Sequence, residues 1–284
     1  MPPVCHHAVV PAPLLIVDGD NLAHRAYHST PKTVLTADGQ PINAIVGFFS
    51  MLIRIWQEER PRGVFVAWDT LGIDTYRSKL WPPYQTGRVF EDSIVEQLGR
   101  LPDLCLACGF GIGKQAGYEA DDLMASACLA EVAQGGTCLL LTTDRDSYQL
   151  VSDRVTVLSP RRGTPILARI GPLEVVKELG VLPEQVPCYK ALAGDSSDKI
   201  PGAKGVGPKT AAALLLRQGT LEGVVASWVA TDAAQCLMFR EVVRMRPEMR
   251  VELPDGEPNW KTGAAKMREL GAATLADRIL ALAA

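Results

Sequence analysis

The chain has 284 residues, 47% of them hydrophobic and 21% charged, which fits one large or two ordinary domains and excludes a disordered or fibrous chain. No apolar run approaches the ~18 residues of a membrane helix, and the seven cysteines lack the regular spacing of a disulfide scaffold. We therefore expect a reduced, cytoplasmic protein with no membrane partner. The net charge of −3 gives no overall basic field that would attract nucleic acid.

After a loose tail over residues 1–13, the first half of the chain alternates apolar runs with segments of helical spacing. Strands are predicted over residues 14–17, 63–68 and 137–143, amphipathic helices over 43–59 and 120–134, and weaker strands over 154–158 and 165–170. This alternation predicts an α/β fold, in which helices flank both faces of a mostly parallel sheet.

From residue 171 onward the pattern is helical, without a convincing long strand. Short helices are predicted over residues 173–179, 184–193, 208–218, 221–229 and 233–245, and an alanine-rich last helix over 272–284. We therefore divide the chain into an α/β domain over 14–170 and an all-helical domain over 171–284.

Two patterns in the first half suggest other chemistry. Gly111–Ala116 matches the letters of a dinucleotide fingerprint, but the next helix opens with carboxylates that would repel a pyrophosphate. Cys105 and Cys108 form a CxxC pair that has no second pair, and we interpret them as buried thiols on a short strand. We therefore expect no nicotinamide cofactor.

Three predicted strands end in aspartate, at Asp18, Asp69 and Asp144. The carboxyl ends of parallel strands form the crevice in which ligands bind, although any one of these aspartates could simply cap the helix that follows. More acids crowd the start of the next helix and the loop that opens the helical domain. The whole set comprises Asp18, Asp69, Glu119, Asp121, Asp122, Asp144, Asp146, Asp195 and Asp198.

Nine carboxylates at one sheet edge repel one another unless cations neutralise them. Oxygen ligands without histidine or cysteine select Mg²⁺ or Mn²⁺, and two such ions ~4 Å apart are the usual device for displacement at a phosphodiester. Without these nine acids the net charge of −3 becomes +6, which suits a polyanionic partner. We therefore interpret the slightly negative net charge as the sum of an acidic metal site and an otherwise basic protein.

A glycine- and lysine-rich segment, Gly202–Thr210, precedes an alanine-rich helix. Gly205 and Gly207 allow the backbone to turn tightly, and a proline follows at the first helical position. The exposed amides of the helix start form an anion site, to which Lys204 and Lys209 add charge. This pattern is typical of a helix–hairpin–helix that grips the duplex backbone; the alternative is an ordinary Gly-Pro helix start with surface lysines.

Four motifs resemble the flap-endonuclease superfamily, most closely the 5′-nuclease domain that begins bacterial DNA polymerase I. They are residues 15–19 (LIVDG), 117–122 (GYEADD), 143–150 (TDRDSYQL) and 194–210 (GDSSDKIPG, then GVGPKT). The likeness runs from about Leu14 to at least Arg246, and no polymerase region follows it. The resemblance implies a free-standing nuclease with a PIN-like or resolvase-like domain, a helical arch near residues 75–98 and a helix–hairpin–helix (H3TH) domain.

The resemblance further implies a two-metal hydrolase that removes nucleotides 5′→3′ and cuts 5′ flaps, in Okazaki fragment processing and DNA repair. Its substrates would be DNA with 5′ flaps, nicks or 5′ ends, and a separate DNA polymerase and ligase would be its partners. Asp18, Asp69, Glu119 and Asp121 would hold one ion, and Asp144, Asp146, Asp195 and Asp198 would hold or position the other, with Asp122 nearby.

The resemblance also assigns residues to the substrate. Catalytic roles in the arch are implied for Arg77, Tyr84, Gln85 and Arg88, of which the two arginines would face phosphates. A phosphate contact is implied for Arg25, and a place near the terminal bases for Tyr27. Duplex binding, together with a potassium ion, is implied at the hairpin for Lys204, Gly205, Gly207, Lys209 and Thr210.

Gln85 is a departure from the family pattern, which has a lysine that approaches the scissile phosphate at this position. Two other functions stay open. One is a related metal-dependent ribonuclease, which the duplex grip disfavours. The other is a non-catalytic module that binds branched DNA, although a pure binder would gain nothing from nine repelling acids.

Overall fold

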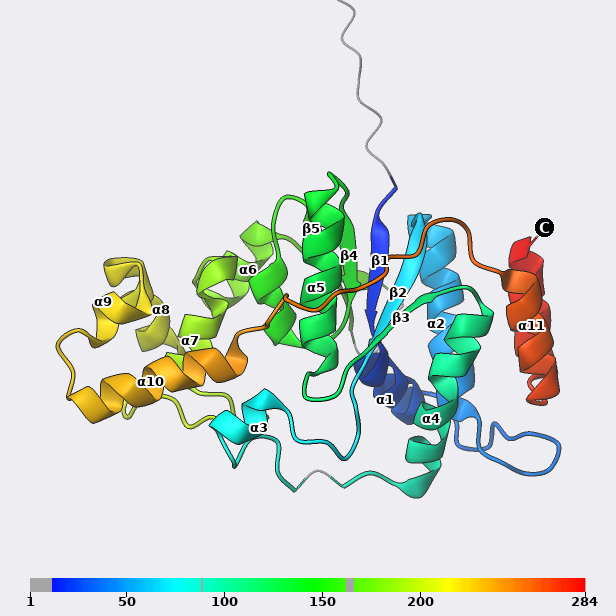
Figure 1. Cartoon of the computed structure of the whole chain (residues 1–284), viewed down its shortest axis with the longest axis horizontal. Helices are drawn as coiled ribbons and strands as arrows, with labels where there is room; N and C mark the ends of the chain where they lie inside the picture. The colour runs from blue at the N-terminus through cyan, green and yellow to red at the C-terminus, as the bar shows by residue number, and fades with distance from the viewer. Residues whose placement is uncertain (1–11, 88, 162–165, 284) are drawn as a thin grey trace, which may run out of the picture.

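The computed structural model describes residues 12–87, 89–161 and 166–283, and Figure 1 shows how its layers are arranged. Within these ranges a six-stranded sheet has the order β3-β2-β1-β4-β5-β6. Strands β1 to β5 run parallel, and β6 runs antiparallel beside β5. The strands are β1 (Leu14–Asp18), β2 (Gly63–Trp68), β3 (Gly111–Lys114), β4 (Cys138–Leu141), β5 (Val155–Pro160) and β6 (Leu167–Ile170). The predicted α/β fold with a mostly parallel sheet is confirmed.

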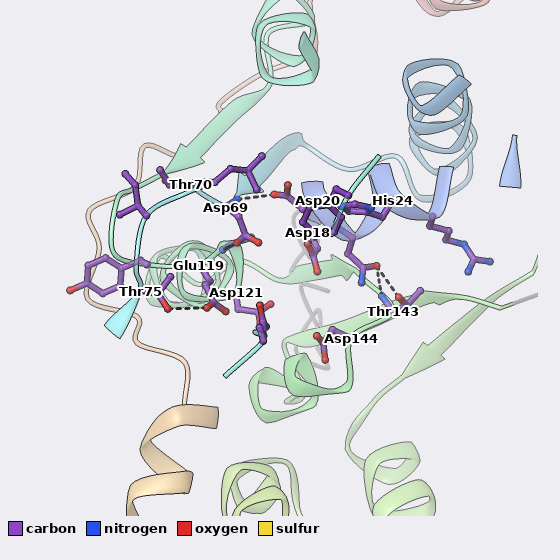
Figure 2. A pocket seen from close by; sticks show the side chains of 18 of the residues that line it. Asp18, Asp20, His24, Asp69, Thr70, Thr75, Glu119, Asp121, Thr143 and Asp144 are labelled. Carbon is purple, nitrogen blue, oxygen red and sulfur yellow. Dashed lines mark hydrogen bonds between the residues drawn. The ribbon is translucent and has the colours of Figure 1, made fainter. Parts of the chain in front are cut away.

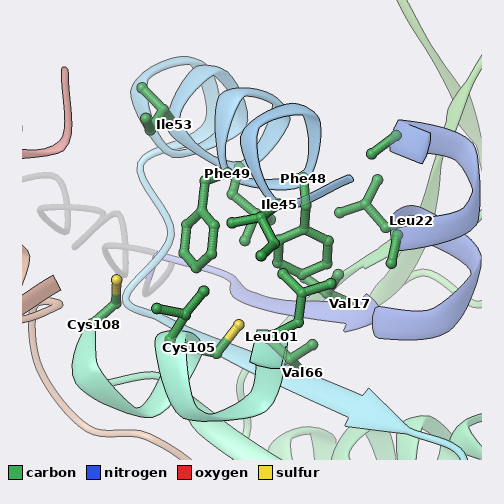
Figure 3. Close-up of a cluster of buried hydrophobic side chains, with 14 of the residues drawn as sticks. Val17, Leu22, Ile45, Phe48, Phe49, Ile53, Val66, Leu101, Cys105 and Cys108 are labelled. Atoms are coloured by element: carbon green, nitrogen blue, oxygen red, sulfur yellow. The ribbon is translucent and has the colours of Figure 1, made fainter. Parts of the chain in front are cut away.

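The central strands are apolar throughout because helices bury both faces of the sheet. In β1, Leu15 and Val17 enter one core, whereas Leu14 and Ile16 enter the core on the opposite face. Figure 3 shows the first core, in which Phe48 lies among aliphatic side chains. The helices of this core include α1 (Gly19–Ser29), α2 (Asn43–Glu59) and α4 (Asp92–Ala107), and α5 (Ala120–Ala133) covers the other face.

The helical part of the chain continues the core on the α5 side of the sheet (Figure 1). Its elements are α6 (Pro172–Leu179), η2 (Pro183–Gln185), α7 (Val186–Ala193), α8 (Pro208–Gln218), α9 (Leu221–Val225) and α10 (Ala230–Val243). The hairpin between α7 and α8 is tied at its base by two glycines with positive φ, Gly194 and Gly202. A Cβ on Gly202 would lie 2.4 Å from the Gly194 nitrogen, so no larger residue fits there.

The last two helices, α11 (Trp260–Glu269) and α12 (Ala273–Leu280), pack elsewhere. The segment after α10 runs back across the sheet to its opposite side (Figure 1), where α11 and α12 join the core of α2 and α4. Trp260 meets Trp56 edge to face, with 5.3 Å between ring centroids. This differs from the expectation that everything after residue 171 forms one helical domain, because local periodicity does not reveal which core a helix joins.

Several elements of the first half, among them α1, α4 and β3, escaped the sequence patterns. Helix α4 extends through Cys105 and is capped by Cys108, so the short strand expected there is wrong, although both thiols are buried. Gly111–Lys114, within the segment that matches the letters of the dinucleotide fingerprint, forms strand β3. A Cβ on Gly113 would lie 2.6 Å from the Phe65 ring, so this glycine serves packing. In the described ranges, no helix has the length and apolar character required to span a bilayer.

Candidate active site

A cavity of about 800 Å³ opens at the carboxyl ends of β1, β2 and β4, as Figure 2 shows. The register of the strands brings these ends to one edge, since Asp18 lies opposite Ala67 and Val17 opposite Leu141. Five of the nine predicted ligands line the cavity: Asp18, Asp69, Glu119, Asp121 and Asp144. Their gathering is the central feature of the site.

Helix caps hold two of these carboxylates in place. Asp18 accepts hydrogen bonds from the backbone nitrogen of Asn21 at 3.1 Å and from Thr142 Oγ1 at 2.8 Å. Asp144 accepts one from the backbone nitrogen of Asp146 at 2.8 Å. Capping and lining the cavity are therefore compatible roles, because a carboxylate has several acceptor positions.

Asp20 also lines the cavity, and sequence reasoning missed it. Its Oδ2 accepts a hydrogen bond from the backbone nitrogen of Asp69 at 2.7 Å, and Asp69 Oδ1 accepts one from the backbone nitrogen of Ala120. Burial, with a further contribution from the charge of Asp69, raises the pKa of Asp20 to about 7. Its place two residues after Asp18 was the available signal, but an acid in the first turn of a helix is ordinary.

The lining acids shift one another's protonation. Burial raises the pKa of Asp18 to about 8, and the charges of Asp69 and Asp144 add to the shift. Burial, with Asp144 and Asp18, raises the pKa of Asp121 well above its ordinary value, and burial also raises that of Glu119. Carboxyl groups shifted in this direction retain protons near neutral pH unless cations replace those protons.

The donor set fits hydrated divalent ions. Over the described ranges, no three acidic, histidine or cysteine side chains are grouped so that they could hold one ion between them. Mg²⁺ keeps several of its waters and uses one or two carboxylates together with substrate phosphates. A wide cavity with carboxylates spaced around it therefore suits Mg²⁺ or Mn²⁺ better than an ion enclosed by protein ligands.

Asp122 occupies a different place from its neighbour Asp121. It is fully buried, and its carboxylate accepts hydrogen bonds from both terminal nitrogens of Arg77, at 2.5 and 2.9 Å, and from the backbone nitrogen of Arg246 at 2.8 Å. Arg77 is only 2% exposed and also donates to the Val242 carbonyl. The structure thus departs from the expectation that Asp122 lies at an ion site and that Arg77 faces a phosphate, since each is the other's buried partner.

A buried lysine separates the remaining predicted ligands. Lys190 on α7 forms ion pairs with Asp146 and with Asp195, the latter at 2.7 Å. Burial favours a higher pKa for Asp195, but hydrogen bonds from Lys190 and Ser197 outweigh it and hold the pKa at about 2. Neither carboxylate lines the cavity. The sequence analysis overlooked Lys190, whose signal was its position five residues before Asp195 on the buried side of a helix.

The expected arch is a short helix followed by a loop. Within the segment 75–98, α3 (Tyr76–Leu80) and the start of α4 are helical, and residues 81–87, which we term the bridging loop, are not. Tyr84 is buried and donates to Glu119 Oε2 at 3.0 Å. Gln85 lines the cavity and donates to Asp198 Oδ1 at 3.0 Å. The bridging loop thereby connects two of the predicted ligands; Arg88 lies outside the described residues.

Of the residues expected to contact the substrate, some line the cavity and others do not. Arg25 lines the cavity, whereas Tyr27 is 2% exposed and its hydroxyl bonds to Glu91 and Ser93 at 2.8 and 2.6 Å. Tyr27 is thus a core residue and does not line the cavity. His24 and Phe90 line the cavity instead, with ring centroids 4.7 Å apart. All five predicted hairpin residues are exposed: Lys204, Gly205, Gly207, Lys209 and Thr210.

Known proteins with similar sequences and folds give the family. Residues 13–180 match the 5′-3′ exonuclease N-terminal resolvase-like domain, and residues 181–260 match the 5′-3′ exonuclease C-terminal SAM fold. DNA polymerase I of Mycobacterium tuberculosis is 38% identical over 75% of this chain, which spans about a quarter (24%) of the polymerase. The 5′-3′ exonuclease of Aquifex aeolicus is 33% identical over 76% of this chain and 73% of its own length.

Solved structures agree on the fold. The bacteriophage T5 D15 protein, co-crystallised with metal ions, superposes with a TM-score of 0.66 at 20% identity, over 95% of this chain and 99% of the phage protein. The catalytic core of Rad2 in complex with DNA substrate gives a TM-score of 0.62 at 16% identity, over 95% and 92% of the two chains. With both of its domains matched and its acids gathered at one sheet edge, the chain belongs to the 5′-3′ exonuclease family of nucleases.

Proposed function

We propose that this nuclease is a divalent-metal-dependent, structure-specific 5′-nuclease that hydrolyses DNA at 5′ ends, nicks and 5′ flaps. The observation that carries the proposal is the set of five carboxylates lining one cavity at the ends of parallel strands. The crystals of the T5 protein with metal ions, and of the Rad2 core with DNA substrate, support the choice of metal and nucleic acid.

One ion would lie near Asp18, Asp69, Glu119 and Asp121, and a second near Asp144 and Asp198, each contacting one or two of these carboxylates directly and the others through its waters. Bound there, the ions would supply a metal-activated water and would neutralise charge on the phosphate that is cut. Mg²⁺ is the ion that we expect, and Mn²⁺ the substitute. Lys190 would tether Asp146 and Asp195 as a built-in cation at the back of the second position.

The chain's own residues orient these acids and the substrate. Tyr84 holds Glu119, and Gln85 holds Asp198, so the bridging loop sets the spacing across the cavity. The Arg77–Asp122 pair, buried beneath α3, fixes the start of this loop. Asp195 and Asp198 lie in the same hairpin as Lys204, and Lys209 stands in the first turn of α8 directly after it. This arrangement suits simultaneous contact with the duplex and the cut strand.

The wider cellular role is a proposal of the same kind. A 5′-nuclease that leaves a nick would act with a separate DNA polymerase and ligase in primer processing and repair, which would place it with chromosomal DNA in the cytoplasm. A potassium ion at the glycines of the hairpin would add to the grip on the duplex phosphate.

The decisive experiment uses a 5′-labelled DNA flap with Mg²⁺, with EDTA, and with an RNA flap as control. Asp144→Asn is the matched variant, because it removes a charge at the cavity and leaves the exposed hairpin lysines intact. We expect the wild type to release the DNA flap only with metal, and the variant to bind the duplex within a few-fold but not to cut it. Preferred cleavage of RNA would indicate a ribonuclease, and binding without cleavage a non-catalytic module.

A further inference from the structure

Three contacts join the bridging loop to the hairpin that carries Asp195 and Asp198. Trp81 Nε1 donates to the Lys199 carbonyl at 2.9 Å, and Gln85 Nε2 donates to Asp198 Oδ1 at 3.0 Å. In the opposite direction, Lys199 Nζ donates to Thr86 Oγ1 at 2.8 Å. The two loops are therefore held together at the point where Gln85 lines the cavity.

Both loops adopt a backbone conformation that residues with a Cβ seldom take. Gln85 has a φ of +50° and Lys199 a φ of +56°. Asparagine, aspartate and histidine tolerate this left-handed region best among residues other than glycine, and lysine has no such advantage. The backbone conformation therefore does not explain why position 199 is a lysine, and we look to the lysine side chain for the explanation.

Lys199 differs from the two buried cations near the site, which are paired with carboxylates. Arg77 is paired with Asp122, and Lys190 lies between two carboxylates. Lys199 is exposed and its bond to Thr86 goes to a neutral hydroxyl, which leaves the ammonium charge able to attract an anion. It stands one residue from Asp198 and is bonded to the residue that follows Gln85.

We propose that Lys199 binds a phosphate of the substrate strand where that strand passes Gln85 at the rim of the cavity. The lysine thereby supplies from the hairpin the positive charge that glutamine does not supply from the bridging loop. This assignment rests on the proposed nuclease function, and it concerns a phosphodiester backbone and not a base, since an ammonium group on a flexible stem reads charge and not sequence.

Lys199→Asn is the sharpest test, because asparagine tolerates the left-handed backbone while it removes the cation together with its hydrogen bond to Thr86. Lys261→Asn on α11, an exposed lysine on the opposite side of the sheet (Figure 1), is the matched control. We expect single-turnover flap cleavage to fall about tenfold, a modest version of losing one preorganised contact to the reacting strand. In EDTA, the salt slope of duplex–flap binding should fall by about one. Lys199→Arg should retain both properties, and Lys261→Asn should change neither.

A charge exchange separates a phosphate contact from a merely structural role. Adding Gln85→Lys to Lys199→Asn should restore most of the lost rate. The inference is overturned if the wild type cuts and Lys199→Asn cuts equally fast with an unchanged salt slope, or if the exchange restores nothing. A wild type that leaves every flap uncut would overturn the proposed function and this inference together.

Discussion

Asp121 and Asp122 are adjacent acids in the first turn of α5, and we expect substitution by asparagine to destabilise the fold at Asp122 but not at Asp121. Asp121 lines the cavity beside Asp144 and Asp18, where burial and like charges raise its pKa. Asp122 faces away from the cavity and is the fully buried partner of Arg77. The two positions share a helix terminus, so the loss of a favourable helix-dipole interaction is common to both variants.

The expected loss of stability in Asp122→Asn follows from the buried groups that lose their partner. Arg77, 2% exposed, would keep only its longer ion pair with Glu119 Oε2 at 3.6 Å, and removing the closer partner of a buried ion pair costs about 3 kcal/mol, the lower end of the usual range. Asp122 also accepts from the Tyr76 hydroxyl at 3.1 Å and from two backbone nitrogens, those of Glu119 and Arg246. With metal absent, the folded state must either keep a proton on Asp121 or bury its charge beside Asp144 and Asp18, and Asp121→Asn removes this cost. The free energy of unfolding of this variant should therefore equal or exceed that of the wild type.

Urea unfolding at pH 7.5 in EDTA measures both variants. With a slope of about 3 kcal/mol/M, Asp122→Asn should lower the midpoint by roughly 1 M or more, and Asp121→Asn should raise it or leave it unchanged. A double variant, Arg77→Met with Asp122→Leu, removes both charges and should recover part of the loss. Equal destabilisation by the two asparagine variants would refute the reasoning, because it would mean that both acids serve α5 alone.

Three further predictions test the hairpin, the cavity and the buried lysine. Lys209→Ala should weaken binding equally for all duplex sequences and lower the salt slope by about one, whereas a loss confined to certain sequences would mean that the hairpin reads bases. In EDTA, thermal stability should fall as pH rises from about 4 to 8, because the pKa values of Asp18 (about 8) and Asp20 (about 7) are raised and the folded state therefore binds more protons than the unfolded state. Bound Mg²⁺ should make this pH dependence shallower. An identical pH profile with and without Mg²⁺ would contradict an ion at these acids. Lys190→Met should lower the free energy of unfolding by about 3 kcal/mol or more in EDTA, with Mg²⁺ restoring part of it, and a variant as stable as the wild type would show that the ion pairs contribute nothing.

The sequence predicted the sheet edge well because the relevant signals are local. An apolar run that ends in aspartate marks both a strand and the edge at which it ends, and this was sufficient to bring Asp18, Asp69 and Asp144 together. The partners of Asp122 and Asp146 are 45 and 44 residues away, at Arg77 and Lys190, and no local pattern links them. The prediction that Tyr27 lies near the terminal bases fails for a related reason, because the position of an aromatic residue on a helix does not show whether its ring faces the cavity or the core.

Helix geometry explains why the nine acids could not all have faced one cavity. Successive residues of an α-helix point about 100° apart, so two adjacent acids in the first turn of α5 cannot both line the same wall. The acids that do not line the cavity pair with buried cations instead: Asp122 with Arg77, and Asp146 and Asp195 with Lys190. These two cations do not reach the surface, so the +6 that remains without the nine acids becomes +4. The surface outside the acidic cluster is therefore still basic, and attraction of a polyanion remains the expectation after the buried charges are set aside.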